Sequence, residues 1–426
     1  MKKNYFLFIV VMLMTFGTSY VNAQHFVVNQ VIVGSGGSYS NPDDFVSMAS
    51  YKPASGVTTT FGNIQTQSIQ DVVINDGFAY VAAQDSIAKF NIDTYERVAI
   101  TEAMGVNRLF VTDDILIASF QFPITENFVK VYSSNDLSLI ANVSDVSDEA
   151  AGITINNNLA YVAVPGGWAS TIGKIAIIDL NDYSLIEEIN FNEQGIGVYD
   201  MFLYNSKIMA VCRTPWGAST ANLLSMNSLG THTDIYPIDQ ELGKMVGEID
   251  GLLFTVMNGG IGIIDLTEFS VADTAFIEAS VLPIAAATLD TIDGNFYITT
   301  TDFSTIGVGT IYDALGIESG SFDAGISADA LAIDYRDNTG IDDLLTENTI
   351  VLFPNPASES ISVSFEGTIL SNDYRIVDVS GRVLKTGTSN FNNKTATIGI
   401  NSLESGLYFL VLSDNKMAIS SPFVKK

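Results

Sequence analysis

The chain has 426 residues, of which 47% are hydrophobic, and a formal net charge of −29 at pH 7. This acidity argues against nucleic acid and anionic membrane surfaces as partners, because a surface that binds phosphates needs clustered lysine and arginine. A single cysteine, Cys212, excludes a disulfide within the chain, so apolar burial must stabilise the fold. We expect the acidic groups to lie on a solvated surface.

Residues 1–23 have the pattern of a secretory signal peptide. Lys2 and Lys3 precede an unbroken apolar run at 6–14, and the short side chains of 21–23 are typical of a cleavage site. The run is shorter than the ~20 apolar residues that span a bilayer, and no later stretch of the sequence approaches that length. We therefore expect cleavage after Ala23, with an uncleaved N-terminal anchor as the alternative. Loss of the two lysines would bring the net charge to −31.

Residues 24–336 contain repeats. The segments 71–82 and 152–163 each hold an apolar strand, a polar turn and a second strand that ends in Ala-Tyr-Val-Ala, and a third and a fourth strand follow each of them. Weaker copies recur about every 40 residues, which is the length of a propeller blade. The six copies lie at 68–100, 105–143, 148–191, 197–238, 241–277 and 283–325. The pattern predicts an all-β protein built as a β-propeller.

The pattern of a blade's first strand occurs a seventh time at Asp329 to Tyr335, but no partner strands follow it. Three segments near the N-terminus have the pattern of strands and can supply the missing partners: 25–33, 45–51 and 57–61. A ring that is closed by strands from both chain ends hides edges that would otherwise be exposed. We therefore predict a seven-bladed β-propeller.

The repeats resemble a known type. Tyr80-Val-Ala with a third strand that closes on Ile92-Asp93, and Tyr161-Val-Ala with 175–179, resemble the YVTN repeat of surface-layer propellers. The segment 26–39 is similar to the opening of surface propellers that are common in Bacteroidetes. Some of those propellers bind corrinoids beside TonB-dependent transporters, so the resemblance implies a surface binding protein. Such a repeat specifies the fold much better than the ligand.

Residues 337–348 are polar and are predicted to be a linker, and the pattern changes after them. Residues 349–426 contain Phe-Pro-Asn-Pro at 353–356, Asp-Val-Ser-Gly-Arg at 378–382, Ser-Gly-Leu-Tyr at 405–408 and a terminal Phe-Val-Lys-Lys. These elements, in this order, closely resemble the C-terminal sorting domain of the type IX secretion system of Bacteroidetes. The resemblance implies a small immunoglobulin-like β-sandwich and passage through the outer membrane, followed by release or by attachment to the cell surface. An ordinary immunoglobulin-like module is the alternative.

The predicted loops differ in length between the two faces of the ring. Turns between first and second strands are short, whereas loops between second and third strands are often long, as at 120–127 and 213–221. The first strands of the blades line the central channel of a propeller. Their alignment places charged residues near the end of this channel that opens on the face of the long loops. Long loops on a rigid scaffold are common places for function, so we predict a ligand site there. Its candidate residues are Trp168, Trp216, Asp71, Arg108, Asp200, Lys244, Asp329, Phe122 and Arg213. Alternatively, the charges are only solvated and the tryptophans only pack against their own loops.

The sequence offers little catalytic chemistry. His25 and His232 are the only histidines, and neither lies in a pattern typical of a metal site or a catalytic triad. The glycine-rich segment 34–37 lacks the lysine and the helix of a phosphate loop, and 290–295 has too few ligands for a calcium loop. We therefore expect no catalytic residue, no metal and no cofactor. A hydrolase or lyase on the propeller is the remaining enzymatic alternative.

Two classes of function fit these observations. The first is a secreted or cell-surface binding protein that captures a glycan or a bulky small molecule, such as a corrinoid for a TonB-dependent transporter. The second is a structural or adhesive surface-layer propeller that binds polymers or proteins. The expected partners are the type IX secretion machinery and this ligand or transporter, without nucleic acid, and the chain is not expected to span a membrane.

Overall fold

We analysed a computed structural model of the chain. It describes residues 26–167, 169–231, 233–337, 349–366, 373–378, 382–388, 395–413 and 418–426. The predicted signal peptide, Trp168, both histidines and most of the predicted linker lie outside these residues. The chain divides into two compact units, of which the first is Phe26–Arg336 and the second contains the strands from Thr349 onward.

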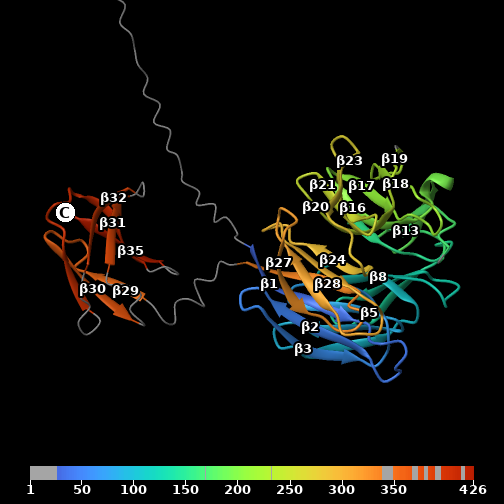
Figure 1. Cartoon of the computed structure of the whole chain (residues 1–426), viewed down its shortest axis with the longest axis horizontal. Coiled ribbons are helices and arrows are strands. Elements are labelled where there is room, and N and C mark those ends of the chain that lie inside the picture. Colours follow the sequence, from blue (N-terminus) through green and yellow to red (C-terminus); the bar gives the residue numbers. More distant parts are fainter. Residues whose placement is uncertain are drawn as a thin grey trace, which may run out of the picture. The chain divides into compact units, whose positions relative to one another are not determined.

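The first unit consists of seven four-stranded sheets, which we call blades 1 to 7 (Figure 1). Blade 1 is β28 (Ala330–Asp337), β1 (Phe26–Ser35), β2 (Val46–Lys52) and β3 (Val57–Ile64). Blade 2 is β4 (Ile69–Asn75), β5 (Phe78–Ala83), β6 (Ser86–Asn91) and β7 (Arg97–Glu102). Blade 3 is β8 (Val106–Val111), β9 (Ile115–Phe120), β10 (Val129–Ser133) and β11 (Leu139–Val143). Blade 4 is β12 (Ile153–Asn156), β13 (Leu159–Val164), β14 (Lys174–Asp179) and β15 (Leu185–Asn190).

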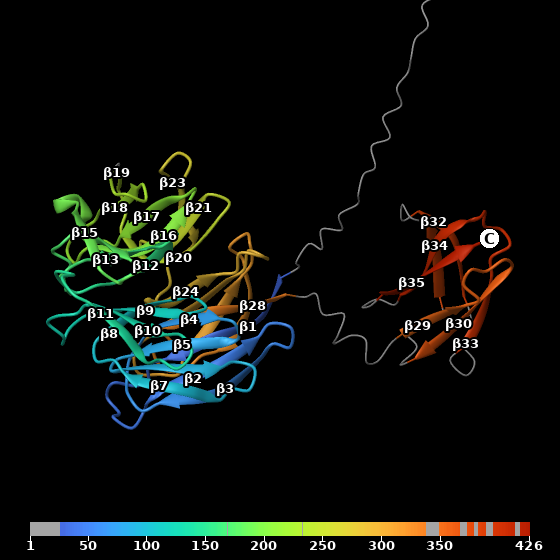
Figure 2. The same cartoon turned by 180° about the vertical axis from the view of Figure 1, so that it is seen from behind.

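The remaining three blades repeat the same order (Figure 2). Blade 5 is β16 (Val198–Tyr204), β17 (Lys207–Cys212), β18 (Ala221–Met226) and β19 (Thr233–Ile238). Blade 6 is β20 (Leu242–Ile249), β21 (Leu252–Met257), β22 (Gly260–Asp265) and β23 (Ser270–Ile277). Blade 7 is β24 (Ile284–Leu289), β25 (Phe296–Thr300), β26 (Val308–Tyr312) and β27 (Glu318–Asp323). A short 3-10 helix, η1 (Asn192–Gly195), connects blades 4 and 5.

The turns between first and second strands show why the strand pairs form where they do. β4 and β5 are joined by Asp76 and Gly77, with φ of 43° and 75°, and β20 and β21 by Asp250 and Gly251, with φ of 52° and 82°. Two consecutive residues with positive φ match the right-handed twist of an antiparallel pair, and Asp-Gly reaches this geometry at little cost. The polar turn in each repeat therefore sets the register of its hairpin.

The core of the ring is divided into seven layers, each between two neighbouring blades. In β5, Ala79 and Val81 belong to the layer shared with blade 1, whereas Tyr80 and Ala82 belong to the layer shared with blade 3. Successive side chains of a strand point to opposite faces, so a strand buried on both faces must be apolar at every position. This explains the unbroken Ala-Tyr-Val-Ala of the repeats.

Blade 1 is built from both chain ends, as predicted. Gly36 N donates to Ser327 O at 2.7 Å where β1 ends and β28 begins, and Asn29 Nδ2 donates to Asp334 Oδ2 at 2.9 Å at the other end of the pair. Asp334 is 2% exposed and also accepts hydrogen bonds from Gln30 at 3.0 Å and from Arg336 at 2.7 Å. These contacts close the ring, and the seven-bladed, all-β fold expected from the repeats is confirmed.

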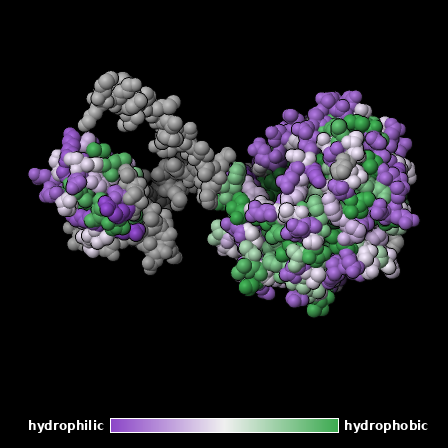
Figure 3. Space-filling view, turned by 90° about the horizontal axis from the view of Figure 1, so that it is seen from above, coloured by the Kyte–Doolittle hydropathy of each residue, from purple (hydrophilic) through white to green (hydrophobic). Residues whose placement is uncertain are grey.

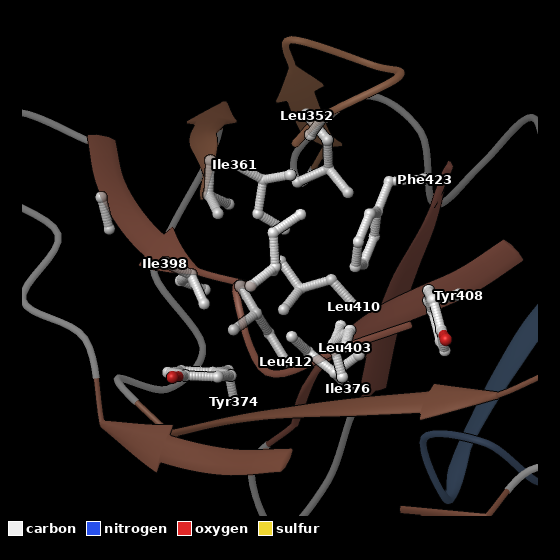
Figure 4. Close-up of a cluster of buried hydrophobic side chains, with 14 residues drawn as sticks. Leu352, Ile361, Tyr374, Ile376, Ile398, Leu403, Tyr408, Leu410, Leu412 and Phe423 are labelled. Carbon is white, nitrogen blue, oxygen red and sulfur yellow. The ribbon is translucent and has the colours of Figure 1, made fainter. Parts of the chain in front are cut away.

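The second unit contains two sheets. One is β29 (Thr349–Phe353), β30 (Ser360–Glu366) and β33 (Thr395–Gly399), and the other is β32 (Val383–Thr388), β31 (Asp373–Asp378), β34 (Gly406–Ser413) and β35 (Ala418–Lys425). Leu352, Ile361 and Ile398 of the first sheet pack with Ile376, Leu410 and Phe423 of the second in one buried cluster (Figure 4). The tail is therefore a small β-sandwich with its own core.

We predict that replacing Asp334 with alanine destabilises the propeller. Because Asp334 is a buried acceptor for three side chains, Asp334→Ala should lower the free energy of unfolding by about 3 kcal/mol. Asp93→Ala is the control, since it removes an exposed partner of Arg336 and should cost less than about 1 kcal/mol. Chemical denaturation measures both values. Equally small losses in the two variants would show that this cluster does not hold the ring closed.

Candidate functional site

The two faces of the propeller differ in the length of their connections. The loops between second and third strands are long in five blades, at 36–45, 121–128, 165–173, 213–220 and 301–307. In blades 2 and 6 the same connection is only 84–85 and 258–259. We call the face that carries these loops and the blade-to-blade connections the loop face. The opposite face, the turn face, carries the connections between first and second strands, which are tight hairpin turns except at 290–295 in blade 7. Both ends of the propeller chain, Phe26 and Asp337, lie on the turn face, where blade 1 lacks the hairpin turn.

First strands of neighbouring blades contact one another, so they line the centre of the ring. Six charged residues, the channel cluster, lie in or next to these strands where they begin: Asp71, Arg108, Asp200, Arg213, Lys244 and Asp329. All six are half-buried. All were predicted from the alignment of the repeats and the loop lengths. The corresponding position in blade 4 is Gly152, where a Cβ would lie 2.2 Å from Tyr199 O, so the backbone of blade 5 packs closely against it.

Irregular pairing positions these side chains. The register between first and second strands shifts near Asp71 in blade 2, near Asp200 in blade 5 and around Lys244 in blade 6. The pairing of β8 with β9 also shifts between Val106 and Leu109, on either side of Arg108. A bulge leaves an extra residue unpaired and redirects its neighbours. Bulges at the same level in several blades therefore turn the charged side chains toward the centre of the ring.

Two of the carboxylates connect neighbouring blades. Asp71 Oδ2 accepts a hydrogen bond from Leu109 N at 2.9 Å, and Asp200 Oδ2 accepts one from Met245 N at 3.1 Å. In each case a first-strand aspartate holds the first strand of the next blade. Asp71 Oδ1 also accepts from Val72 N at 3.0 Å. The oxygens of Asp71 and Asp200 are thus engaged within the ring, which gives both residues a structural role.

The environments of these two carboxylates have opposite effects on their pKa values. Burial raises the pKa of Asp71, and Arg108, whose Nη1 lies 3.9 Å from Asp71 Oδ1, offsets this only in part. Burial also disfavours the ionised form of Asp200, but Arg213 binds it through two hydrogen bonds of 2.8 and 2.6 Å. This bidentate pair, together with Arg108, holds the pKa of Asp200 below its ordinary value.

Two residues outside the predicted set organise the arginines. The guanidinium groups of Arg213 and Arg108 lie over the ring of Tyr199, 3.6 and 5.3 Å from its centroid. The Tyr199 hydroxyl donates to Asn107 Oδ1 at 2.9 Å, and Asn107 Nδ2 donates to Ala150 O at 2.8 Å. Tyr199 thus connects blades 3, 4 and 5. In the sequence, the only signal that could identify Tyr199 and Asn107 is that each directly precedes a charged residue of the channel cluster.

Lys244 and Asp329 have fewer partners than the other cluster members. Lys244 Nζ donates to Ala285 O, and no hydrogen bond to the Asp329 carboxylate is found among the described residues. Burial, together with repulsion by Arg108 and Arg213, lowers the pKa of Lys244 to about 8. Burial raises the pKa of Asp329, and Lys244 offsets this in part. Of the channel cluster, Lys244 and Asp329 therefore have the most hydrogen-bonding capacity left for a bound molecule.

Two of the pockets on the loop face are lined by predicted site residues. The Phe122 pocket, with a volume of about 480 Å³, is lined by Asn107, Gln121, Phe122, Glu149, Ala150, Pro165, Gly167, Ser170 and Tyr199. The Trp216 pocket, of about 310 Å³, is lined by Thr214, Pro215, Trp216, Gly217, Ala218, Glu241, Leu242, Gly243, Val256, Asn258 and Gly259. Phe122 and Trp216 are each 77% exposed. Apolar residues lie among hydrophilic ones on the propeller surface that is in view in Figure 3.

The predicted site residues thus fall into three groups. The six charged residues form the channel cluster, and Phe122 lies beside it, because Tyr199 contacts Arg213 of the cluster and also lines the Phe122 pocket. Trp216 lines a separate pocket. Trp168 lies outside the described residues.

Comparison with known proteins identifies the tail. Residues 351–426 match the family described as the secretion system C-terminal sorting domain. No curated protein sequence matches the chain. Of the helices in the described part of the chain, none is both long and apolar enough to cross a membrane.

Comparison with solved structures supports the propeller fold. The chain is similar to the extracellular domain of a putative one-component system from B. thetaiotaomicron, with a TM-score of 0.50, 10% identity, and coverage of 95% of this chain and 59% of that one. It is also similar to the Cps50 (Swd1) β-propeller domain of Myceliophteria thermophila, with a TM-score of 0.52, 8% identity, and coverage of 68% and 99%. A hypothetical selenium-binding protein from Sulfolobus tokodaii gives a TM-score of 0.52, 11% identity, and coverage of 73% and 91%. At these identities the likeness concerns the fold alone. Together with the sorting domain, it makes the chain a β-propeller protein that the type IX secretion system sends to the cell surface or beyond.

The lowered pKa of Lys244 predicts a pH-dependent stability. Its ordinary pKa of 10.5 applies to the unfolded chain and about 8 to the folded one, so the unfolded state binds more protons between these values. The contribution of Lys244 to the free energy of unfolding therefore rises as pH increases through this window. Denaturation at about pH 7.5 and pH 9.5 should show the wild type gaining stability relative to Lys244→Met. A difference between the two proteins that does not change with pH would contradict the lowered pKa.

Removal of the sorting domain should block export without unfolding the ring. All seven core layers of the propeller lie within residues 26–336, so deletion of 349–426 leaves them intact. We expect the truncated protein to be folded and trapped in the periplasm, as cell fractionation would show. Normal amounts of it outside the cell would contradict the sorting role, and a lower melting temperature would show that the tail packs on the ring.

Proposed function

We propose that the protein is a secreted or cell-surface binding protein that holds its ligand on the loop face, in the Phe122 pocket and the adjoining channel cluster. The observation that carries this proposal is the position of Tyr199. One side of this residue lines the pocket, and the guanidinium of Arg213 lies 3.6 Å from its ring centroid. An exposed aromatic ring and the Glu149 carboxylate therefore line one opening, and both arginines of the cluster lie against Tyr199 in its wall. Such sites combine apolar walls with a few polar groups.

The size of the pocket favours a small polar ligand. Its volume of about 480 Å³ falls within the range of roughly 300–1,000 Å³ that is usual for small-molecule sites. A sugar unit or a molecule of similar size would fit inside. A corrinoid, which the repeat resemblance suggests, would have to lie across the loops, with only one edge in the pocket. Transfer of such a ligand to a TonB-dependent transporter is part of this proposal and rests on the same resemblance.

We infer binding and not catalysis from the state of the acidic groups. Asp71 and Asp200 are held by backbone N–H groups of the next blade, and Asp200 is also held by Arg213. A general acid or base must exchange a proton with a substrate, and these two groups are committed to the ring instead.

A structural or adhesive role is the second candidate, and exposed apolar side chains on the loop face favour it. Val281 and Leu282 lie between blades 6 and 7, and Phe303 and Ile306 lie in the long loop of blade 7; all four are exposed, with Val281 at 101%. Exposed apolar groups that gather in adjoining loops are typical of surfaces that bind proteins or polymers. A partner of this kind would be a polymer or protein of the cell surface.

Calorimetry of the purified propeller against corrinoids and soluble glycans tests the proposal. Phe122→Ala should weaken the binding of the active compound by about 1–3 kcal/mol, because aromatic anchors contribute a large share of binding energy. It should hardly change stability, since the side chain is 77% exposed. Asn157→Ala and Asn205→Ala change the turn face and should leave binding unaltered.

Two results would contradict the proposal. Binding that is lost in the turn-face variants but retained in Phe122→Ala would place the site on the opposite face. Failure of every corrinoid and glycan to bind, together with adsorption of the protein to surface polymers that Val281→Asp abolishes, would favour the adhesive role.

A further inference from the structure

Of the two aromatic rings that line the Phe122 pocket, only one is left for a ligand. The guanidinium of Arg213 lies 3.6 Å from the ring centroid of Tyr199, and the Tyr199 hydroxyl already donates to Asn107. The ring of Phe122 is exposed, and within the described part of the chain no aromatic or cationic group lies against it. This uncovered ring can bury an apolar surface of a bound molecule.

Three polar side chains of the pocket also lack partners. The Glu149 carboxylate, the Gln121 amide and the Ser170 hydroxyl line the pocket and are half-buried, and no hydrogen bond of these groups is found among the described residues. The Asn107 amide, by contrast, is engaged at both ends. An ionised carboxylate only accepts hydrogen bonds, whereas an amide and a hydroxyl both donate and accept. The pocket therefore offers donors as well as acceptors beside an aromatic ring.

The loop opposite Phe122 holds the carboxylate in an accessible position. Ile172 N donates to Pro165 O at 3.0 Å, and Ser170 N donates to Gly167 O at 3.0 Å, so two hydrogen bonds close this loop. A Cβ at Gly167 would lie 3.3 Å from Glu149 Oε1, so a side chain at this position would crowd the carboxylate. The glycine leaves the carboxylate accessible before a ligand binds, and a preformed site lowers the ordering cost of binding.

From these groups we propose that the Phe122 pocket binds one neutral saccharide unit, with an apolar face of the sugar ring on Phe122 and two neighbouring hydroxyl groups donating to the Glu149 carboxylate. A pyranose has C–H groups on the faces of its ring and hydroxyl groups around its edge, and each hydroxyl both donates and accepts. Gln121 and Ser170 complete the site by bonding to the remaining hydroxyl groups. This assignment rests on the function proposed above and narrows the ligand to one chemical class.

The charges near the pocket argue against an anionic ligand. None of the described residues that line it is a lysine or an arginine, and Arg213 is already paired with Asp200 through bonds of 2.8 and 2.6 Å. A carboxylate or phosphate group would thus meet the charges of Glu149 and the preceding Asp148 without a free cation to offset them.

A cationic amine uses the pocket less completely than a sugar does. An ammonium group can donate to Glu149 and lie on Phe122, but it accepts no hydrogen bond. The donors of Gln121 and Ser170 would then receive no partner from the ligand. A corrinoid exceeds the pocket volume of about 480 Å³ and would place only one edge among these groups.

Saturation-transfer NMR of the mature protein with methyl glycosides of glucose, galactose and mannose tests the assignment. At least one of these neutral sugars should bind, and competition titration gives its affinity. The corresponding uronic acid glycoside should bind at least about tenfold more weakly, because its carboxylate is repelled by Glu149. The corresponding 2-amino sugar should bind no more tightly than the neutral glycoside.

Matched variants separate a ligand-binding Glu149 from a structural one. Glu149→Gln should weaken binding of the neutral glycoside about fivefold or more, because a charged acceptor makes stronger hydrogen bonds. It should also reduce the preference for the neutral glycoside over the uronate, which a purely structural role would leave unchanged. Glu126→Gln removes the same charge from an exposed position in the loop of Phe122 and should alter neither value. Thermal melting checks folding, and Glu149→Asp, which keeps the charge and should keep the preference, serves if Glu149→Gln does not fold.

Several outcomes would overturn the assignment, and they differ in what they mean for the proposed function. Tighter binding of the uronate or of the amino sugar would make the pocket a site for charged ligands. Binding of a corrinoid that depends on Phe122, without binding of any glycoside, would leave the proposed function intact and refute the sugar class. Glycoside binding that neither Phe122→Ala nor Glu149→Gln alters would place the sugar outside the pocket and contradict both, as would the absence of all binding.

Discussion

Burial of both faces of every blade is the constraint on which the rest of the molecule depends. Each strand near the centre supplies side chains to two core layers, so a blade that lost a neighbour would expose a complete apolar face. A ring satisfies this requirement for all seven sheets at once, provided that its first and last blades meet. Here they meet within blade 1, where the buried Asp334 joins strands that lie about 300 residues apart in the sequence.

Closure of this kind leaves the loops free to vary. The hairpin turns are held short by the geometry of antiparallel pairs, and the chain enters and leaves the ring on their face. The loop face has neither restriction. It carries the long loops, the exposed Phe122 and Trp216, and the inner ends of the first strands. The channel cluster lies there because bulges interrupt the strand pairing at similar positions in several blades.

Much of this arrangement could be predicted from the sequence. The Ala-Tyr-Val-Ala segments and their spacing identify blades, and the unpaired strand at 329–335 indicates closure by the N-terminus. The same alignment predicts that four charged residues lie at one position along the axis of the ring: Asp71, Asp200, Lys244 and Asp329. Repeats place equivalent residues at equivalent positions in their blades. Loop lengths and the positions of charged strand starts thus predict the face on which a site would lie.

The contacts within the cluster could not be predicted in the same way. Tyr199 and Asn107 are 92 positions apart and belong to different blades, so no local pattern joins them. Asp71 and Asp200 looked like free ligand-binding groups, but bulges direct them to backbone N–H groups of the next blade. The sequence predicts one ligand site that includes Phe122 and Trp216, but they line separate pockets, because the loops that carry them fold against different neighbours. Contacts of this kind depend on the exact register between blades, which the repeat pattern does not encode.

Hydrogen exchange of the backbone amides, compared between the free protein and the protein saturated with its ligand, shows whether ligands bind at the loop face beside the channel cluster. If they do, exchange should become slower in the loops at 121–128 and 165–173 and stay unchanged in the hairpin turns at 75–78 and 204–207. Protection confined to the hairpin turns, with the two loops unaffected, would contradict binding at the loop face.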